Sequence, residues 1–187
     1  MATAHSKSGS KSASSKKSAS EARSKTPAEH SQGAKENAIR LLEQDHRAVE
    51  KLFASFESAR SDDRKQQLAD RICLELKVHT QIEEEIFYPA AGRALDDHDM
   101  IDEAIVEHAS AKRLIAEIEA MQAGQDMFDA TVKVLGEQID HHVEEEEKEL
   151  FPECRKANMD MEALGERLRQ AKLELMNKLT GGRSSAH

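Results

Sequence analysis

The chain has 187 residues, a net charge of −9 at pH 7 and, with no Trp, one Tyr and three Pro, a composition typical of helices. No apolar run approaches the roughly 20 residues of a membrane helix, and the N-terminus lacks the apolar centre of a secretory signal. We therefore expect a cytoplasmic protein without a membrane partner, in which Cys73 and Cys154 are reduced packing residues.

The first 35 residues differ from the rest of the chain. They carry seven Lys/Arg and two Asp/Glu, a net charge of +5, so the total of −9 leaves −14 on the remainder. This Ser-, Ala- and Lys-rich segment buries too little apolar surface to offset its ordering entropy. We predict a disordered tail over 1–35, with weak polyanion contact as its functional alternative, one domain over 36–180 and a frayed end over 181–187.

Five helices are predicted from apolar residues that recur at alternating steps of three and four. They span about residues 36–60, 62–88, 98–121, 127–151 and 160–179. Pro89 and Pro152 are expected to end the second and fourth helices. The short connections predict an all-α, up-down-up-down four-helix bundle, with the C-terminal fifth helix covering one end or side.

Ionisable residues interrupt the inward-facing row of each bundle helix. The predicted rows are Ile39, Leu42, His46, Val49, Phe53 and Phe56; Leu68, Ile72, Leu76, His79, Glu83 and Ile86; Ile101, Ile105, His108, Ala111, Ile115 and Ile118; and Phe128, Val132, Leu135, Ile139, His142, Glu146 and Leu150. In the second and fourth rows a Glu follows a His by four residues, which places the two side chains together on one helix face.

The chain contains an internal repeat. His46 and His79 are 33 residues apart, and His108 and His142 are 34 residues apart. Each half is therefore a helix hairpin with one His on its first helix and His-x-x-x-Glu on its second. The folded bundle is expected to bring four His and two Glu to its centre.

A metal site explains these buried polar groups. An ionised Glu without a partner costs several kcal/mol or more to bury, and divalent cations would pair with the carboxylates and with the imidazole lone pairs. The mixed nitrogen and oxygen donors favour iron over manganese or zinc. The metalloprotease signature His-Glu-x-x-His is absent, and the Glu-x-x-His spacing of ferritin-like proteins occurs only at Glu43 to His46.

The fourth helix offers two registers for its ligands. His141 and Glu145 have the same spacing as His142 and Glu146, but position 141 lies about 100° off the apolar row. The ten-residue distance to the following Pro also selects His142. We expect His141 to be exposed or to support a ligand, and the surplus acids to be mostly solvated, although Glu84 is placed to reach the site.

Together these motifs resemble the hemerythrin family, specifically the bacterial HHE cation-binding domains. The resemblance covers about residues 39–179, and its motifs are Asp45-His46, His79-x-x-x-Glu83 with Phe-Tyr-Pro, Glu107-His108, and His142-x-x-x-Glu146 with Leu-Phe-Pro. It implies a hemerythrin-like bundle around two Fe ions bridged by oxide or hydroxide. The implied ligands are Glu83 and Glu146 as bridging carboxylates, with His46, His79, His108 and His142 as terminal ligands.

The sequence also departs from the oxygen-carrying hemerythrins. Those proteins have a fifth His one turn before the His of the third helix, where this chain has Ala104. The four-His, two-Glu set is more similar to the iron-sensing hemerythrin domain of a ubiquitin-ligase subunit and to di-iron proteins that repair iron–sulfur clusters. About one coordination position would stay open on each iron, and an open position distinguishes a reactive site from a structural one.

These features favour a non-haem di-iron protein that binds or senses dioxygen, nitric oxide or iron itself. The alternatives are a di-iron enzyme acting on peroxide or nitric oxide, and an iron donor in cluster repair. A metal-free helical interaction protein is disfavoured, because its four buried His and two buried Glu would be poorly matched. The expected partner is a small diatomic ligand or peroxide.

Overall fold

The computed structural model describes residues 37–181. The predicted tail over 1–35 and nearly all of the predicted frayed end over 181–187 lie outside these residues. The described part is helical throughout, with no strand. Its elements are α1 (Ala38–Ser58), α2 (Asp62–Ile82), the π-helix η1 (Glu83–Phe87), α3 (Tyr88–Ala94), α4 (Asp99–Glu119), α5 (Phe128–Glu145), the π-helix η2 (Glu146–Leu150), α6 (Phe151–Lys156) and α7 (Met161–Gly181).

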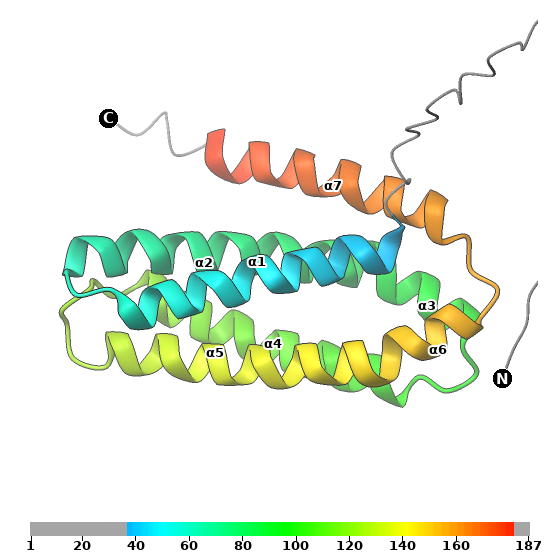
Figure 1. Cartoon of the computed structure of the whole chain (residues 1–187), viewed down its shortest axis with the longest axis horizontal. Coiled ribbons are helices and arrows are strands. Elements are labelled where there is room, and N and C mark those ends of the chain that lie inside the picture. The colour runs from blue at the N-terminus through cyan, green and yellow to red at the C-terminus, as the bar shows by residue number, and fades with distance from the viewer. Residues whose placement is uncertain (1–36, 182–187) are drawn as a thin grey trace, which may run out of the picture. The chain divides into compact units, whose positions relative to one another are not determined.

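The predicted four-helix bundle is confirmed. Helices α1, α2, α4 and α5 run alternately up and down, with α1 packed on α2 and α4 packed on α5 (Figure 1). The fifth helix, α7, lies along one side of the bundle and packs on α1, α2 and η1 (Figure 1). Its Leu164 and Leu168 are buried, which explains why an amphipathic helix follows the bundle.

Local sequence signals set the helix starts. The Asn37 side chain accepts a hydrogen bond from the Arg40 backbone amide at 2.9 Å, and the Ser61 side chain accepts one from the Arg64 amide. These contacts satisfy donors that the first helical turn leaves unpaired. Before α5 the chain turns through Gly124 and Met127, which both have positive φ.

Pro89 and Pro152 do not end their helices, which corrects the sequence-based prediction. Each lies in the first turn of a new α-helix, α3 or α6, that continues directly from a π-helical segment. Proline is tolerated in the first turn of an α-helix, because the backbone N–H that it lacks would have no partner within the helix at that position. The two π-helices begin at Glu83 and Glu146, the residues predicted to bridge a metal pair. π-Helical turns often occur at functional sites.

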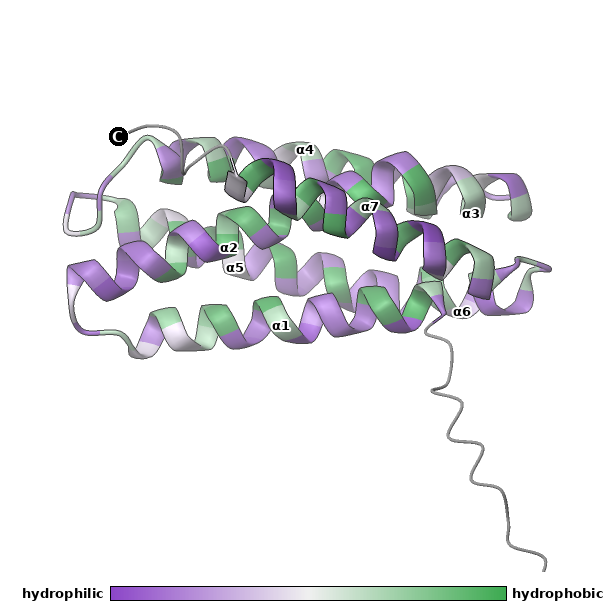
Figure 2. Cartoon of the chain, turned by 90° about the horizontal axis from the view of Figure 1, so that it is seen from above, coloured by the Kyte–Doolittle hydropathy of each residue, from purple (hydrophilic) through white to green (hydrophobic). Residues whose placement is uncertain are grey.

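The apolar core has two parts, separated along each bundle helix by the buried His and Glu. One includes Ile39, Phe87, Phe151 and Leu168, and the other includes Phe56, Ile72, Ile115 and Leu135. Figure 2 shows apolar residues recurring along the inner faces of the helices.

Three positions of the predicted inward rows differ from the structure, since Phe53, like Ile86, is only half-buried. Ile105 is 43% exposed, and Ala104 occupies the inward position between Ile101 and His108. In η1 the wider turn places Phe87 fully inside, while Ile86 is only half-buried. Cys73 and Cys154 are both buried, and they are not joined to each other by a disulfide.

Candidate metal centre

The structure brings together all six residues predicted as metal ligands. His46 comes from α1, His79 from α2, His108 from α4 and His142 from α5, while Glu83 and Glu146 begin η1 and η2. Every one of these side chains is buried, with relative exposure between 0 and 5%. Their place in the fold follows from the repeat, because each hairpin presents its His and Glu at matching heights of the bundle.

The imidazoles form two pairs. Nε2 of His46 lies 3.1 Å from Nε2 of His79, and Nε2 of His108 lies 3.1 Å from Nε2 of His142. Two ligands bound about 2.1 Å from one ion at a right angle would be about 3.0 Å apart. Each pair therefore has the separation of two neighbouring ligands of a single cation.

Both glutamates lie between the two pairs. Glu83 Oε2 is 3.1 Å from His79 Nε2 and 3.5 Å from His108 Nε2. Glu146 Oε2 is 3.3 Å from His46 Nε2 and 3.6 Å from His142 Nε2. Each carboxylate thus contacts one imidazole of each pair, which is the arrangement required of a group that bridges two cations.

The outward nitrogens of the four imidazoles face further acids. His46 Nδ1 lies 2.8 Å from Glu147, His108 Nδ1 3.0 Å from Glu84, and His142 Nδ1 2.7 Å from Glu107. His79 Nδ1 lies 3.7 Å from Asp45. An ionised carboxylate only accepts hydrogen bonds, so these contacts favour the tautomer with the proton on Nδ1. Metal-binding His residues are commonly oriented in this way.

This tautomer leaves the inner lone pairs unmatched. The Nε2 lone pairs then face each other and the carboxylate oxygens at the centre of the bundle. Both oxygens of Glu83 and the Oε2 atom of Glu146 have no hydrogen-bond donor among residues 37–181. Buried acceptors without donors are costly, and cations are the groups that would satisfy all of them together. The residues present therefore fit a pair of divalent cations.

Basic side chains hold three of the four outer acids. Arg47 pairs with Glu147, Lys112 with Glu84, and Lys172 of α7 with Asp45. The fourth acid, Glu107, lies 3.9 Å from His141. These contacts fix the carboxylates and so fix the imidazole planes that they orient.

The outer acids were largely missed from the sequence. Glu147, like most of the surplus acids, was expected to be solvated, and only Glu84 was expected to reach the site. The available signal was position: Asp45 and Glu107 directly precede a His, and Glu84 and Glu147 directly follow a Glu of the site. Matched placement in both halves distinguishes them from the other acids.

Tyr88 is a further residue of the site that the sequence analysis did not identify. Its buried hydroxyl donates a hydrogen bond to Glu146 Oε1 at 2.9 Å and lies 3.3 Å from His108 Nε2. The matching residue of the second half is Phe151, whose ring stacks on His46 with centroids 5.9 Å apart. The difference between Phe-Tyr-Pro and Leu-Phe-Pro was the sequence signal, and it makes the two halves of the site chemically unequal.

Burial and mutual repulsion shift the ionisation of the site. Burial raises the pKa of Glu83 well above its usual value, and the charge of Glu146 raises it further. Burial also opposes ionisation of Glu146, but its interactions with His46 and His142 outweigh burial and lower its pKa to about 2. Burial, then His142 and His79, lower the pKa of His108 to about 2. In the metal-free protein a proton is therefore held on Glu83 in preference to Glu146 or His108.

His141 and Glu145 lie outside the buried centre. The His141 side chain is 63% exposed, and its Nε2 atom lies 3.2 Å from Glu145. The structure thus assigns the inward register of α5 to His142 and Glu146, as expected. The pair His141 and Glu145, together with Glu107, forms a separate group at the protein surface.

Comparison with known proteins identifies the family. The family model described as the hemerythrin HHE cation binding domain matches residues 37–154. The chain belongs to the hemerythrin HHE family. The family match thus indicates that this hemerythrin domain binds cations within its helical bundle.

Two curated relatives and one solved structure are similar to the chain. A protein named DNA nickase from Nostoc sp. is 26% identical over 78% of this chain and 42% of its own length. An uncharacterized hemerythrin-like protein of Schizosaccharomyces pombe is 26% identical over 64% of this chain and 60% of its own length. The chain therefore spans less than two thirds of either relative.

The solved structure supports the fold. It is the crystal structure of a hemerythrin HHE cation binding domain-containing protein from Mycobacterium kansasii, 21% identical in sequence. The TM-score is 0.69, and the match covers 81% of this chain and 94% of that one. Among the helices of residues 37–181, none has the length and apolar character needed to cross a membrane.

Proposed function

We propose that this hemerythrin domain is a non-haem di-iron protein that binds or senses dioxygen, nitric oxide or iron itself. The observation that carries the proposal is the position of Glu83 and Glu146, each of which contacts one imidazole of both His pairs. A site for a single ion has no need of two carboxylates shared in this way. Two divalent cations held by the four imidazoles and the two shared carboxylates would use every one of these six buried ligands.

The donor set favours iron for these two positions. Four imidazole nitrogens and two carboxylates form a mixed nitrogen and oxygen set, which suits iron, manganese or zinc rather than magnesium or calcium. Bound iron would supply redox chemistry and open coordination positions for a small ligand. The six buried residues proposed as ligands are His46, His79, Glu83, His108, His142 and Glu146.

The surrounding residues protect and tune such a site. Phe87 and Phe151, both fully buried, pack edge to face beside the centre with ring centroids 5.5 Å apart. This apolar wall limits access by water and other polar molecules from its side of the centre. Tyr88 is the one hydroxyl group that contacts both a proposed bridging carboxylate and a proposed histidine ligand within the described residues.

The proposal is tested by an anaerobic Fe(II) titration of the metal-free protein. We expect saturation near two irons per chain, followed by a change in the visible spectrum when air is admitted. His79→Ala and Glu83→Ala should remove most of the bound iron while leaving the chain helical by circular dichroism. His98→Ala is the control, because His98 is exposed and is not one of the six proposed ligands.

Either of two results would overturn the proposal. One is wild-type protein that takes up no iron at stoichiometric concentrations. The other is unchanged iron content in both His79→Ala and Glu83→Ala. Uptake of two manganese or zinc ions in place of iron would leave the geometry intact and replace the metal in the proposal.

Tyr88 favours a second candidate, a di-iron enzyme that acts on peroxide or nitric oxide. A buried hydroxyl at hydrogen-bond distance from the site is placed to give a proton to a reacting molecule. Catalysed loss of peroxide above the rate of free iron, reduced in Tyr88→Phe, would support this candidate over simple binding. Phosphodiester cleavage, suggested by the name of the Nostoc relative, is not favoured by the charge of −14 outside the first 35 residues.

A further inference from the structure

The two halves of the repeat present different surfaces beside the metal centre. Residues of α1 match residues 62 positions later in α4, as His46 matches His108, and residues of α2 and η1 match those 63 positions later, as His79 matches His142. On the first half three positions are apolar: Leu41, Ile82 and Ile86. The matching positions on the second half are all acidic: Glu103, Glu145 and Glu149.

The apolar surface of the first half is closed. Leu41 and Ile82 are buried and belong to the same apolar cluster as Leu164 and Leu168 of α7. Helix α7 packs on α1, α2 and η1, so it covers the side of the bundle that these residues occupy (Figure 1).

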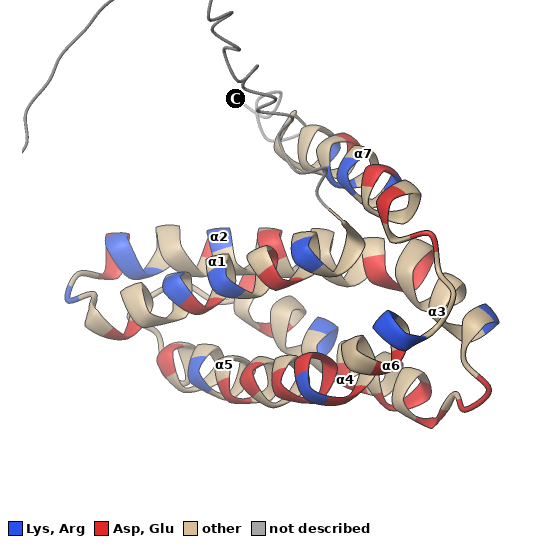
Figure 3. Ribbon diagram, turned by 45° about the vertical axis from the view of Figure 1, so that its right-hand side comes forward, with Lys and Arg blue, Asp and Glu red and all other residues tan. Residues whose placement is uncertain are grey.

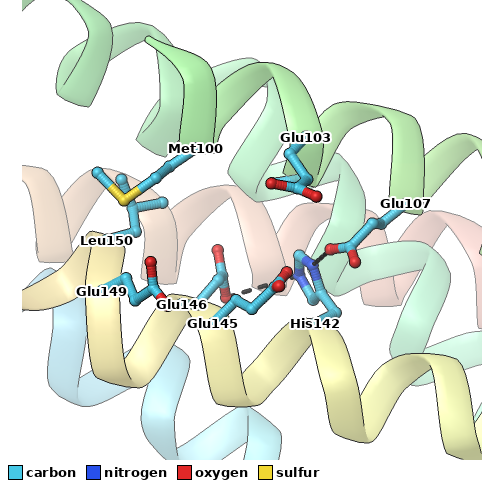
Figure 4. Close-up of a pocket in the computed structure, with 9 residues that line it drawn as sticks. Met100, Glu103, Glu107, His142, Glu145, Glu146, Glu149 and Leu150 are labelled. Carbon is cyan, nitrogen blue, oxygen red and sulfur yellow. Dashed lines mark hydrogen bonds and ion pairs between the residues drawn. The ribbon is translucent and has the colours of Figure 1, made fainter. Parts of the chain in front are cut away.

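The acidic surface of the second half contains a pocket that leads to the centre. The pocket lies between α4 and the α5–η2 segment and has a volume of about 30 Å³, enough for a water molecule or a small ion. Figure 4 shows Glu103 and Glu107 on one wall, Glu145 and Glu149 on the other, and His142 and Glu146 at the base. Of the four wall acids, Glu103 and Glu149 are exposed, and Glu107 and Glu145 are half-buried.

The base of the pocket contains a carboxylate oxygen of the proposed metal centre that is unpartnered within the described part of the chain. Glu146 is 2% exposed and lines the pocket, and its Oε2 atom has no hydrogen-bond partner among residues 37–181. Two of the wall acids, Glu107 and Glu145, lie close enough to the exposed His141 to hold one ion together with it. No Lys or Arg forms an ion pair with Glu103 or Glu149 within residues 37–181, so their charge is not neutralised locally.

We infer that the acid-lined pocket between α4 and α5–η2 is the entry port for Fe²⁺, with Glu107, His141 and Glu145 as a transient binding station at its wall. Figure 3 shows many Asp and Glu residues along α4 and α5. Clefts lined by one sign of charge raise the local concentration of counter-ions and their association rates by about 10- to 1,000-fold. The inference rests on the proposed function, because it gives the route by which that site is filled.

The position of Ala104 supports the same route. Its match in the first half is Leu42, which is fully buried in the apolar cluster on the side covered by α7. Ala104 lines the acidic pocket. The small side chain thus keeps space open at the position that a leucine fills in the first half.

The test measures how fast the metal-free protein takes up Co(II), an oxygen-stable probe whose visible absorption reports coordination. The port variant is Glu103→Gln with Glu149→Gln, which changes no proposed ligand. The control is Glu117→Gln with Glu137→Gln, which removes two exposed acids of α4 and α5 that lie away from the pocket. We expect the port variant to bind about tenfold more slowly at low ionic strength, with the difference shrinking at high salt, and the control to bind within about twofold of wild type.

A second variant tests the pocket without changing its charge. Ala104→Leu should slow uptake at every ionic strength, because the obstacle is steric, while the final Co(II) content stays equal to that of wild type. Its folding is checked by circular dichroism, and the double Gln variant decides the question if Ala104→Leu does not fold.

The inference is overturned if the port variant binds as fast as wild type, or if the control is slowed equally. It is also overturned if the port variant loses metal content at equilibrium, because these acids would then belong to the site itself. Failure of wild type to bind metal at all is a different outcome, and it contradicts the proposed function.

Discussion

Lys172 of α7 forms an ion pair with Asp45 of α1, and Asp45 in turn faces His79 Nδ1 at 3.7 Å. Helix α7 therefore contributes a side chain that holds one of the acids facing the histidines of the metal centre. The Asp45 side chain is only 11% exposed, and the desolvation that would raise its pKa is outweighed by His79 and Lys172, which lower it.

Replacing Lys172 by Met should destabilise the protein. It leaves the largely buried carboxylate of Asp45 without its cation, at a cost of about 1–3 kcal/mol in the free energy of unfolding. Lys112→Met is the matched control, because the pair of Lys112 with Glu84 is more exposed, at 44% and 28%, and should be worth less than about 1 kcal/mol. Urea unfolding of the metal-free proteins measures both, and equal losses would contradict a special role of α7.

Replacing Tyr88 by Phe should preserve the fold and the metal content. The matched position already holds Phe151, so a phenyl ring is compatible with this environment. The lost hydrogen bond to Glu146 should cost about 1 kcal/mol of stability. If the hydroxyl supplies a proton, oxidation of the Fe(II)-loaded protein by peroxide should slow by about 100-fold or more in stopped-flow measurements. Unchanged kinetics would assign Tyr88 a structural role alone.

Replacing Glu83 by Gln should stabilise the metal-free protein at neutral pH but not in acid. The pKa of Glu83 is raised in the folded state by burial and then by Glu146, so the folded protein binds this proton more tightly than the unfolded chain. The stability that this tighter proton binding adds is fully present below the pKa of Glu83 in the unfolded chain, about 4.5. It is lost as the pH rises toward the pKa of Glu83 in the folded protein.

The loss should be about 1.4 kcal/mol per pH unit in that window, which corresponds to about 3–6 °C in melting temperature. Glu83→Gln carries no titrating proton, so its melting temperature should match wild type near pH 4 and exceed it increasingly above that pH. Thermal melts of both metal-free proteins between pH 4 and 8 give the comparison. A constant difference across this range would show that Glu83 does not hold the proton.

Deleting residues 1–35 should leave the iron stoichiometry unchanged. Every residue proposed to hold or orient the metal pair, from Asp45 to Lys172, lies in the part of the chain that the structure describes. Metal analysis of the shortened chain measures this directly. Reduced iron content would mean that the tail takes part in the site.

The sequence predicted the bundle and the inward positions because both depend on one simple periodicity. His46, His79, His108 and His142 interrupt apolar rows that follow the α-helical repeat, and the structure places all four inside. The outer layer was harder to predict because a π-helix adds a residue to the turn at Glu83 and at Glu146. Glu84 and Glu147 lie in these π-helical turns, and they contact His108 and His46 of the other hairpin, which a pattern along a single helix does not report.

The π-helical turns also explain why the prediction that proline ends the second and fourth helices was wrong. Pro89 and Pro152 interrupt an α-helical hydrogen-bond pattern, but the preceding π-helical turns have already changed that pattern. Tyr88 was overlooked because a single hydroxyl has no periodic signal. The repeat distinguishes it from Phe151, but its hydrogen bond to Glu146, 58 residues away, is seen only in the structure.

Two of the four outer carboxylates cross between the halves of the molecule, while Asp45 and Glu107 each face a His of their own half. Glu84 of the first hairpin orients His108 of the second, and Glu147 of the second orients His46 of the first. Neither hairpin could complete the centre alone, so a protein made of one hairpin would need to assemble as a homodimer. Duplication within a single polypeptide removes the symmetry that such a dimer would impose. It allows one half to carry Tyr88 and the other Phe151, and it allows one side to be covered by a helix while the opposite side keeps its acids.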